Sequence, residues 1–131
     1  MGMRILLTCA AACMIAATIA PAQDAVKVDP KHYKVETENA HVRVLRIHYG
    51  PHEKSVMHSH PDSVVVYLTD GSIRFTSPDG KTQEAQAKAG QTQYTPAQVH
   101  DPENVGDKPF EAILVELKSA KAVGPTKSTK K

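Results

Sequence analysis

The chain has 131 residues, of which 40% are hydrophobic and 23% charged, a profile typical of one ordinary globular domain. Sixteen Lys and Arg against fourteen Asp and Glu leave a formal net charge of +2, without the basic excess of a nucleic-acid-binding protein. Aromatic residues make up 5%, which argues against a base-stacking platform and leaves seven histidines as the one surplus.

The first 22 residues have the pattern of a secretory signal peptide. Arg4 precedes an apolar run from Ile5 to Ile19, and Ala20-Pro21-Ala22 supplies small residues for a cleavage site. A membrane-spanning anchor is the alternative, but it needs about twenty apolar residues, more than this run holds. We therefore expect cleavage before Gln23, a periplasmic or secreted protein, and no integral membrane span in the mature chain.

Short runs of β-branched and apolar residues alternate with turn signals from Val35 onward. No helical stretch of convincing length interrupts them, so the pattern predicts an all-β sandwich or closed barrel. The dipeptides Asp70-Gly71 and Asp79-Gly80 favour two consecutive β-hairpins. The predicted strands are His32–Thr37, His41–Tyr49, Ser63–Leu68, Ser72–Ser77, Thr82–Gln86, Gln91–Thr95 and Phe110–Leu117, with a weaker one near Lys54–His58.

We expect residues 23–117 to form this single β-domain. Both cysteines, Cys9 and Cys13, lie in the predicted signal peptide, so the mature domain must be held together by its core or by a metal. Past Leu117 the chain is rich in Lys, Ser, Thr and Pro, which predicts a basic flexible tail over 118–131. A contact of this tail with anionic lipid or polymer is the functional alternative.

Two stretches place histidines where they could bind a cation. His58-Ser59-His60 precedes an apolar strand, and residues i and i+2 on an extended backbone project to the same face. Such a pair is common on protein surfaces and is a weak indication by itself. In the second stretch, a predicted strand after Gly90 leads to a turn at Pro96, and His100 follows at the start of the next strand, before Asn104.

Taken together, the two stretches resemble the two motifs of the cupin superfamily. The first motif has Gly, five residues, HxH, three or four residues, Glu, six residues and Gly; the second has Gly, five residues, PxG, two residues, His, three residues and Asn. The matching residues are His58, His60 and Gly71 in the first motif, and Gly90, Pro96, His100 and Asn104 in the second. The resemblance spans about residues 43–117 and implies a single cupin-type β-barrel, also called a double-stranded β-helix or jelly roll. The chain is most similar to the small exported cupins of bacteria, and this resemblance implies a homodimer.

The departures from the family pattern concern the metal site. The expected Glu, four or five residues after the second His, is replaced by Val64 and Val65. Asp62 and Asp101 are open alternatives for a further ligand, and strict counting would place Asp101 at the position of the third histidine. The spacing from His100 to Asn104 favours His100.

The resemblance therefore leaves a three-imidazole set of His58, His60 and His100. Such a set suits Zn²⁺, Fe²⁺, Cu²⁺, Ni²⁺ or Co²⁺, which the sequence does not distinguish, and it keeps open positions for a ligand. Tyr67 has the strand parity of the missing Glu, and Gln98 stands near His100, so both are predicted to contact a ligand in the barrel. The other histidines are interpreted as structural or exposed: His32, His41, His48 and His52.

The sequence is compatible with two candidate functions. One is a metal-dependent enzyme acting on a small molecule, and three-histidine sites are known among cupins resembling thiol and diketone dioxygenases. The other is a non-catalytic cupin that binds a small ligand without a required metal. The sequence offers no separate general base, so it leaves open whether the protein is an enzyme.

Overall fold

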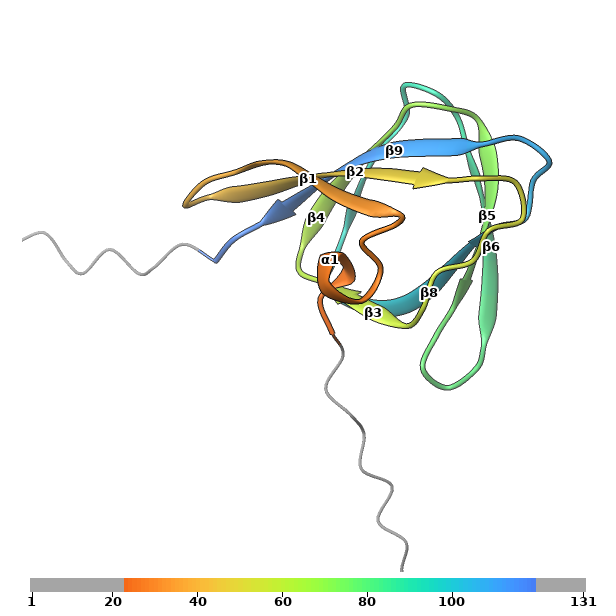
Figure 1. Ribbon diagram of the computed structural model, residues 1–131, viewed down its shortest axis with the longest axis horizontal. Helices are drawn as coiled ribbons and strands as arrows, with labels where there is room; N and C mark the ends of the chain where they lie inside the picture. Colours follow the sequence, from red (N-terminus) through yellow and green to blue (C-terminus); the bar gives the residue numbers. More distant parts are fainter. Residues whose placement is uncertain (1–22, 120–131) are drawn as a thin grey trace, which may run out of the picture.

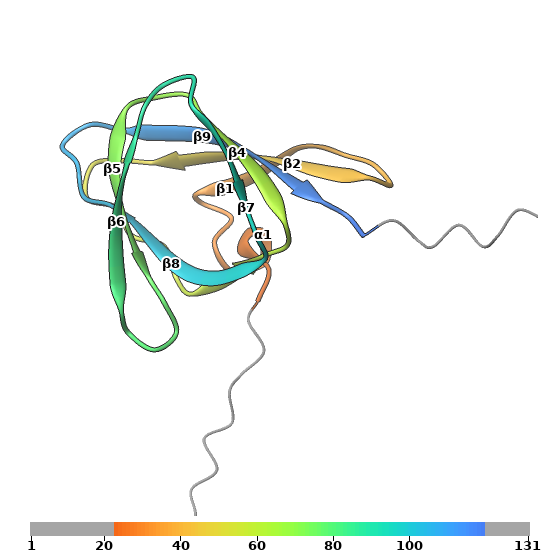
Figure 2. The ribbon, with the colours of Figure 1, turned by 180° about the vertical axis from the view of Figure 1, so that it is seen from behind.

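A computed structural model describes residues 23–119 as two antiparallel β-sheets that face each other (Figures 1 and 2). One sheet has the strand order β1-β2-β9-β4-β7, and the other has the order β3-β8-β5-β6. The elements are α1 (Ala25–Val28), β1 (Tyr33–Glu38), β2 (Val42–Tyr49), β3 (His58–His60), β4 (Ser63–Tyr67), β5 (Gly71–Thr76), β6 (Thr82–Ala87), β7 (Thr92–Thr95), β8 (Gln98–Asn104) and β9 (Phe110–Leu117). This architecture confirms the predicted all-β class.

The predicted terminal segments lie largely outside these residues. The signal peptide covers residues 1–22 and most of the predicted tail covers 120–131, so cleavage and tail behaviour stay predictions. None of the helices in the part of the chain that the structure describes is long and apolar enough to cross a membrane.

The core lies between the two sheets, because alternate side chains of each strand point inward. β9 shows this period in Phe110, Ala112 and Leu114, all buried, and it is paired along its whole length with β2. Burial of such apolar side chains supplies the main driving force for folding. The fourth inward residue of β9 is charged: Glu116 is only 2% exposed.

The two predicted hairpins have different outcomes. Asp79-Gly80 turns the chain between β5 and β6, where Gly80 adopts a positive φ of 83° and its N–H donates to the carbonyl of Ser77 at 2.8 Å. The prediction of a hairpin at Asp70-Gly71 is wrong, because β4 and β5 belong to different sheets. Gly71 is needed there for close packing, since a Cβ at this position would lie 2.7 Å from Cδ2 of Phe110.

Substituting Gly71 tests that packing. We expect Gly71→Ala to lower the free energy of unfolding by about 1–3 kcal/mol, because the added methyl group must displace the buried Phe110 ring. Urea denaturation of Gly71→Ala and of Ser72→Ala, the next residue on β5, provides the comparison. Equal stabilities for the two variants would show that Phe110 moves aside without cost.

The strand expected to begin at His100 is β8, which begins at Gln98, and the strand predicted near Lys54–His58 was placed too early. β8 contains Pro102, which lacks a donor, but its carbonyl accepts a hydrogen bond from the Ser55 N–H at 2.9 Å. The carbonyl and nitrogen of one residue face the same side of a strand, so the proline nitrogen points away from β5 and costs no ladder hydrogen bond. The weak strand predicted near Lys54–His58 is corrected to β3, with Lys54 forming only an isolated bridge to Glu103.

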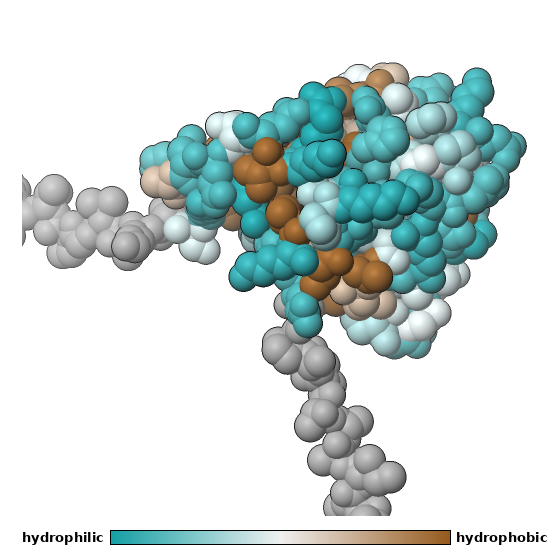
Figure 3. Space-filling view, in the orientation of Figure 1, coloured by the Kyte–Doolittle hydropathy of each residue, from teal (hydrophilic) through white to brown (hydrophobic). Residues whose placement is uncertain are grey.

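The surface is mostly hydrophilic on the face drawn in Figure 3, with an apolar strip over β1 and α1. The β1–β2 hairpin extends beyond the rest of the barrel (Figure 1), and β1 is an edge strand whose Val35 is exposed. The homodimer stays a prediction.

Candidate metal centre

Three histidines meet inside the barrel on two neighbouring strands. His58 and His60 share one face of β3, and His100 lies on β8 directly opposite His58 in the antiparallel register. Each offers a ring nitrogen, and these nitrogens all lie within 4.8 Å of one another. All three residues are buried, so the structure brings together the set that the sequence predicts.

The hydrogen bonds of His58 and His60 determine which ring nitrogen carries the proton. Nδ1 of His58 lies 2.7 Å from the carbonyl of Val56, and Nδ1 of His60 lies 2.7 Å from Oε1 of Glu116. Carbonyl and carboxylate oxygens only accept, so both Nδ1 atoms donate, and Nε2 of each ring carries a lone pair when that ring is neutral. These two Nε2 atoms face each other at 3.0 Å. When both rings are neutral, their two lone pairs repel at this distance unless a cation lies between them.

His100 adds a third donor atom. Both of its ring nitrogens are buried, and neither has a hydrogen-bond partner among residues 23–119. The ring of Phe75 stacks against it with centroids 5.2 Å apart, which fixes its plane. Buried polar atoms without a partner are uncommon, so the orphaned nitrogens of His100 fit a ligand position for a metal.

The pKa values of these rings favour the neutral form that metal binding needs. Burial, with a smaller effect of the neighbouring His60, lowers the pKa of His58 to about 4. Burial, together with His60 and His58, lowers the pKa of His100 to about 3. Both rings are therefore neutral near pH 7, as imidazole ligands must be.

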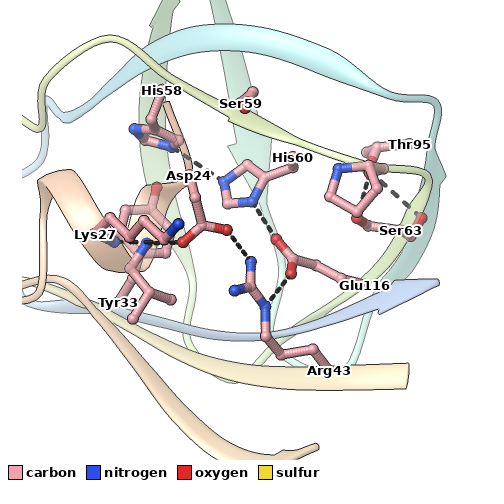
Figure 4. Close-up of polar contacts among 12 residues, drawn as sticks. Asp24, Lys27, Tyr33, Arg43, His58, Ser59, His60, Ser63, Thr95 and Glu116 are labelled. Carbon is pink, nitrogen blue, oxygen red and sulfur yellow. Dashed lines mark hydrogen bonds and ion pairs between the residues drawn. The ribbon is translucent and has the colours of Figure 1, made fainter. Parts of the chain in front are cut away.

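A chain of charges lies behind His60 (Figure 4). Arg43 donates from Nε to Oε2 of Glu116 at 2.6 Å and from Nη2 to the carboxylate of Asp24, which caps α1 through the Val26 N–H. Burial by itself would raise the pKa of the Glu116 carboxyl group, but hydrogen bonds from His60 and Arg43 outweigh it and hold that pKa lowered. Glu116 is therefore an ionised carboxylate that orients His60 and makes its Nε2 a better ligand.

Sequence reasoning missed Glu116, although a signal for it exists. The inward positions of β9 read Phe110, Ala112, Leu114 and Glu116, and an acidic residue in an apolar series of period two is unusual. The register of β9 with β4 pairs Glu116 with Ser63 and so brings it close to His60.

The alternative acidic ligands lie elsewhere. The Asp62 carboxylate accepts a hydrogen bond from the Ala97 N–H at 2.8 Å, and Asp101 pairs with Nζ of Lys54 at 3.2 Å. Within the described residues, the cluster that could hold a metal consists of the three histidines and includes neither aspartate. Val65, one of the two residues at the expected Glu position, is buried and points into the barrel.

A cavity of about 70 Å³ adjoins His60 and His100 between the two sheets. Tyr67 and Gln98 both contribute to its wall, as the strand parity of Tyr67 predicts. Their contact with a ligand stays a prediction.

The remaining histidines have structural or exposed positions. His32 is buried, and it has acidic partners that sequence reasoning missed: Nδ1 lies 2.7 Å from Asp29 and Nε2 lies 3.1 Å from Glu53. Asp29 reaches it through the turn after α1, and Glu53 comes from a separate loop. The other three histidines are exposed: His41, His48 and His52. His52 also forms a surface ion pair with Asp107.

The sequence model of the cupin domain matches residues 45–116, which include all three histidines. The chain belongs to the cupin family. The family match covers the barrel from β2 to β9, so the cupin motifs that the sequence resembles are the ones that form this centre.

Solved structures agree with this assignment. A cupin domain from Bordetella pertussis is 27% identical to this cupin, with a TM-score of 0.63 over 66% of this chain and 92% of that one. A conserved protein with a double-stranded β-helix domain from Klebsiella pneumoniae is 25% identical, with a TM-score of 0.53 over 65% and 74%. An RmlC-like cupin from Methanocaldococcus jannaschii, 22% identical with a TM-score of 0.51 over 68% and 83%, shares the fold. A search of curated proteins finds no match.

Proposed function

We propose that this cupin binds a divalent transition-metal ion through His58, His60 and His100 and uses it to hold a small-molecule ligand. The observation that carries the proposal is the pair of Nε2 atoms facing each other at 3.0 Å, with Nδ1 of each ring bound to an acceptor on its opposite side. A metal ion bound by both nitrogens removes their repulsion.

The donor set also narrows the choice of metal. Three neutral nitrogens suit Fe²⁺, Co²⁺, Ni²⁺, Cu²⁺ and Zn²⁺, whereas Mg²⁺ and Ca²⁺ favour oxygen ligands. The set includes no carboxylate, so the bound ion keeps its full charge toward a ligand. When bound, such an ion supplies a Lewis acid or a redox centre.

The chain's own residues would hold and orient the ligand. Gln98 stands opposite His60 in the register of β3 and β8, where its amide could reach a ligand bound at the histidines. The cavity wall among the described residues includes no Asp or Glu, so its side chains supply no carboxylate general base. The proposal is therefore metal-centred binding, with any chemistry dependent on the ion.

We also propose that the protein acts outside the cytoplasm. The signal-peptide pattern of residues 1–22 supports this, and so does the placement of both cysteines within that segment. The domain from Gln23 onward contains no cysteine and needs no disulfide, because its stability comes from the apolar core and the ion pairs around Glu116.

Calorimetric titration with Co²⁺ or Zn²⁺ tests the proposed function. We expect His60→Ala to weaken binding by more than about tenfold, because it removes one of three protein ligands. The nearest carboxylate, Glu116, contacts Nδ1 on the opposite side of the ring from Nε2 and is held by Arg43 at 2.6 Å. His41→Ala, an exposed histidine in the turn before β2, is the matched control and should leave the affinity unchanged. Equal affinities for wild type and both variants would show a cupin that has lost its metal and would favour the metal-free alternative.

A further inference from the structure

The cavity beside the histidines has an almost entirely apolar wall. Both sheets contribute side chains, and none of the lining residues is Asp, Glu, Lys or Arg. The wall is formed largely by Ile47, Val65, Ile73, Phe75, Phe110 and Leu114.

The polar groups of the wall are all uncharged outside the histidines. The hydroxyls of Tyr33 and Tyr49 lie 2.7 Å apart and bind each other. Tyr67 and Gln98 could form hydrogen bonds with a ligand, but neither could neutralise a charge on it. The charged side chains behind His60, Glu116 and Arg43, are paired with one another at 2.6 Å.

This wall discriminates by charge. A charged group that enters the cavity loses its hydration and finds no ionic partner apart from an ion held by the histidines. An uncharged group of the same shape loses little and gains apolar contact.

The volume adds a limit on size. A dry protein cavity of about 150 Å³ holds benzene, with its six carbon atoms. A cavity of about 70 Å³ is half that size and has room for roughly three non-hydrogen atoms.

We propose that the cavity binds the uncharged body of a small ligand, about three or four non-hydrogen atoms in size, while the donor atom of the ligand faces the metal. Val65 bounds the space for this body, because it is a buried part of the wall at the position where a cupin of the usual pattern would have its acidic ligand. This inference rests on the metal-binding function proposed above, and it adds the class of ligand: one whose body, beyond the donor atom, is small, compact and uncharged.

Three probes of equal shape and different charge test the proposal: acetamide, acetate and acetamidinium. Each is titrated into the metal-free protein, with the methyl resonances of Val65 and Leu114 as the readout. We expect acetamide to shift these resonances and to bind roughly tenfold or more tightly than either ion, because only the ions carry an uncompensated charge into the cavity. The proposal is overturned if an ion binds as tightly as acetamide, or if acetamide shifts neither methyl group.

A repeat with the Zn²⁺-loaded protein separates the two proposals. Tighter acetamide binding in the presence of Zn²⁺ supports both. Acetamide binding that Zn²⁺ leaves unchanged, in a protein whose calorimetric titration shows no metal uptake, overturns the metal proposal and leaves the cavity proposal standing.

A matched pair of variants tests the role of Val65. Val65→Ala should strengthen the binding of a larger neutral amide, isobutyramide, by several-fold relative to acetamide, because it lengthens the cavity. Val64→Ala, the adjacent residue on the other face of β4, should leave the ratio unchanged. The same ratio in both variants would contradict the assignment of Val65, and thermal melts establish that both variants are folded.

Discussion

Glu116→Ala is expected to lower the free energy of unfolding by about 3–5 kcal/mol, as measured by urea denaturation at pH 7. The carboxylate is 2% exposed and accepts hydrogen bonds from Nε of Arg43 at 2.6 Å and from Nδ1 of His60 at 2.7 Å. Its removal leaves a largely buried guanidinium group with one carboxylate partner, Asp24, and leaves the His60 Nδ1–H without an acceptor.

Glu116→Gln separates orientation from charge. An amide oxygen can still accept the hydrogen bond from His60, but the negative charge that makes this imidazole a better ligand is gone. We therefore expect metal affinity to fall by about 10- to 100-fold while the protein remains folded. Glu111→Gln on the same strand is the control. The Glu111 side chain is 37% exposed and 3.9 Å from Arg46, so removing its charge should lower the free energy of unfolding by less than about 1 kcal/mol. A Glu116→Ala variant as stable as this control would refute the argument.

The cupin motifs identify the fold because their residues meet local physical requirements. Gly90 adopts a positive φ of 83° in the turn before β7, and Gly71 allows the close approach of Phe110. Asn104, only 1% exposed, donates from its amide to the carbonyls of Gly50 and Lys108 and so holds two loops together. The motif histidines are also placed by local rules, since i and i+2 share a strand face.

The features that sequence reasoning missed depend on contacts between distant segments. Glu116 is 56 residues from His60 in the chain, and a strand register is required to bring the two together. The prediction of a hairpin between β4 and β5 failed for the same reason, since these strands belong to different sheets. In the sequence, a glycine that allows close packing cannot be distinguished from a glycine that makes a turn. The extent of β8 across Pro102 could not be predicted either, because the orientation of this proline depends on the sheet around it.

Acid is expected to destabilise the metal-free protein over a defined pH range. In the fold, burial and neighbouring imidazoles lower the pKa of His58 to about 4 and that of His100 to about 3, against about 6.5 in the unfolded chain. Above pH 6.5 both states are neutral at these residues. Below it the unfolded chain binds protons that the folded chain does not, so stability falls until the folded pKa values are reached. The lowered pKa of Glu116 adds a loss of the same sign at lower pH.

Each of these histidines lowers the free energy of unfolding by about 1.4 kcal/mol per pH unit in this range. For the two together, the loss amounts to several kcal/mol between pH 6.5 and pH 4. Urea denaturation across this range measures it. His100→Leu removes one of the two titrating groups, so it should reduce the slope of stability against pH by the contribution of one histidine. His41→Ala, at an exposed residue, should leave that slope unchanged. An unaltered slope in His100→Leu would mean that this residue titrates normally in the fold.

Bound metal is expected to oppose the acid effect. An ion that binds only the folded barrel stabilises it by about 2.7 kcal/mol at a free concentration one hundred times the dissociation constant, and a chelator removes that gain. At His58 and His100, protons compete with the metal only near the folded pKa values of these two rings, which are about 4 and about 3. The difference in melting temperature with and without chelator should therefore persist at pH 5.5, well below the point where a free imidazole would be half protonated. A difference that disappears by pH 6 would contradict the argument that the lowered pKa values of His58 and His100 protect the bound metal from acid.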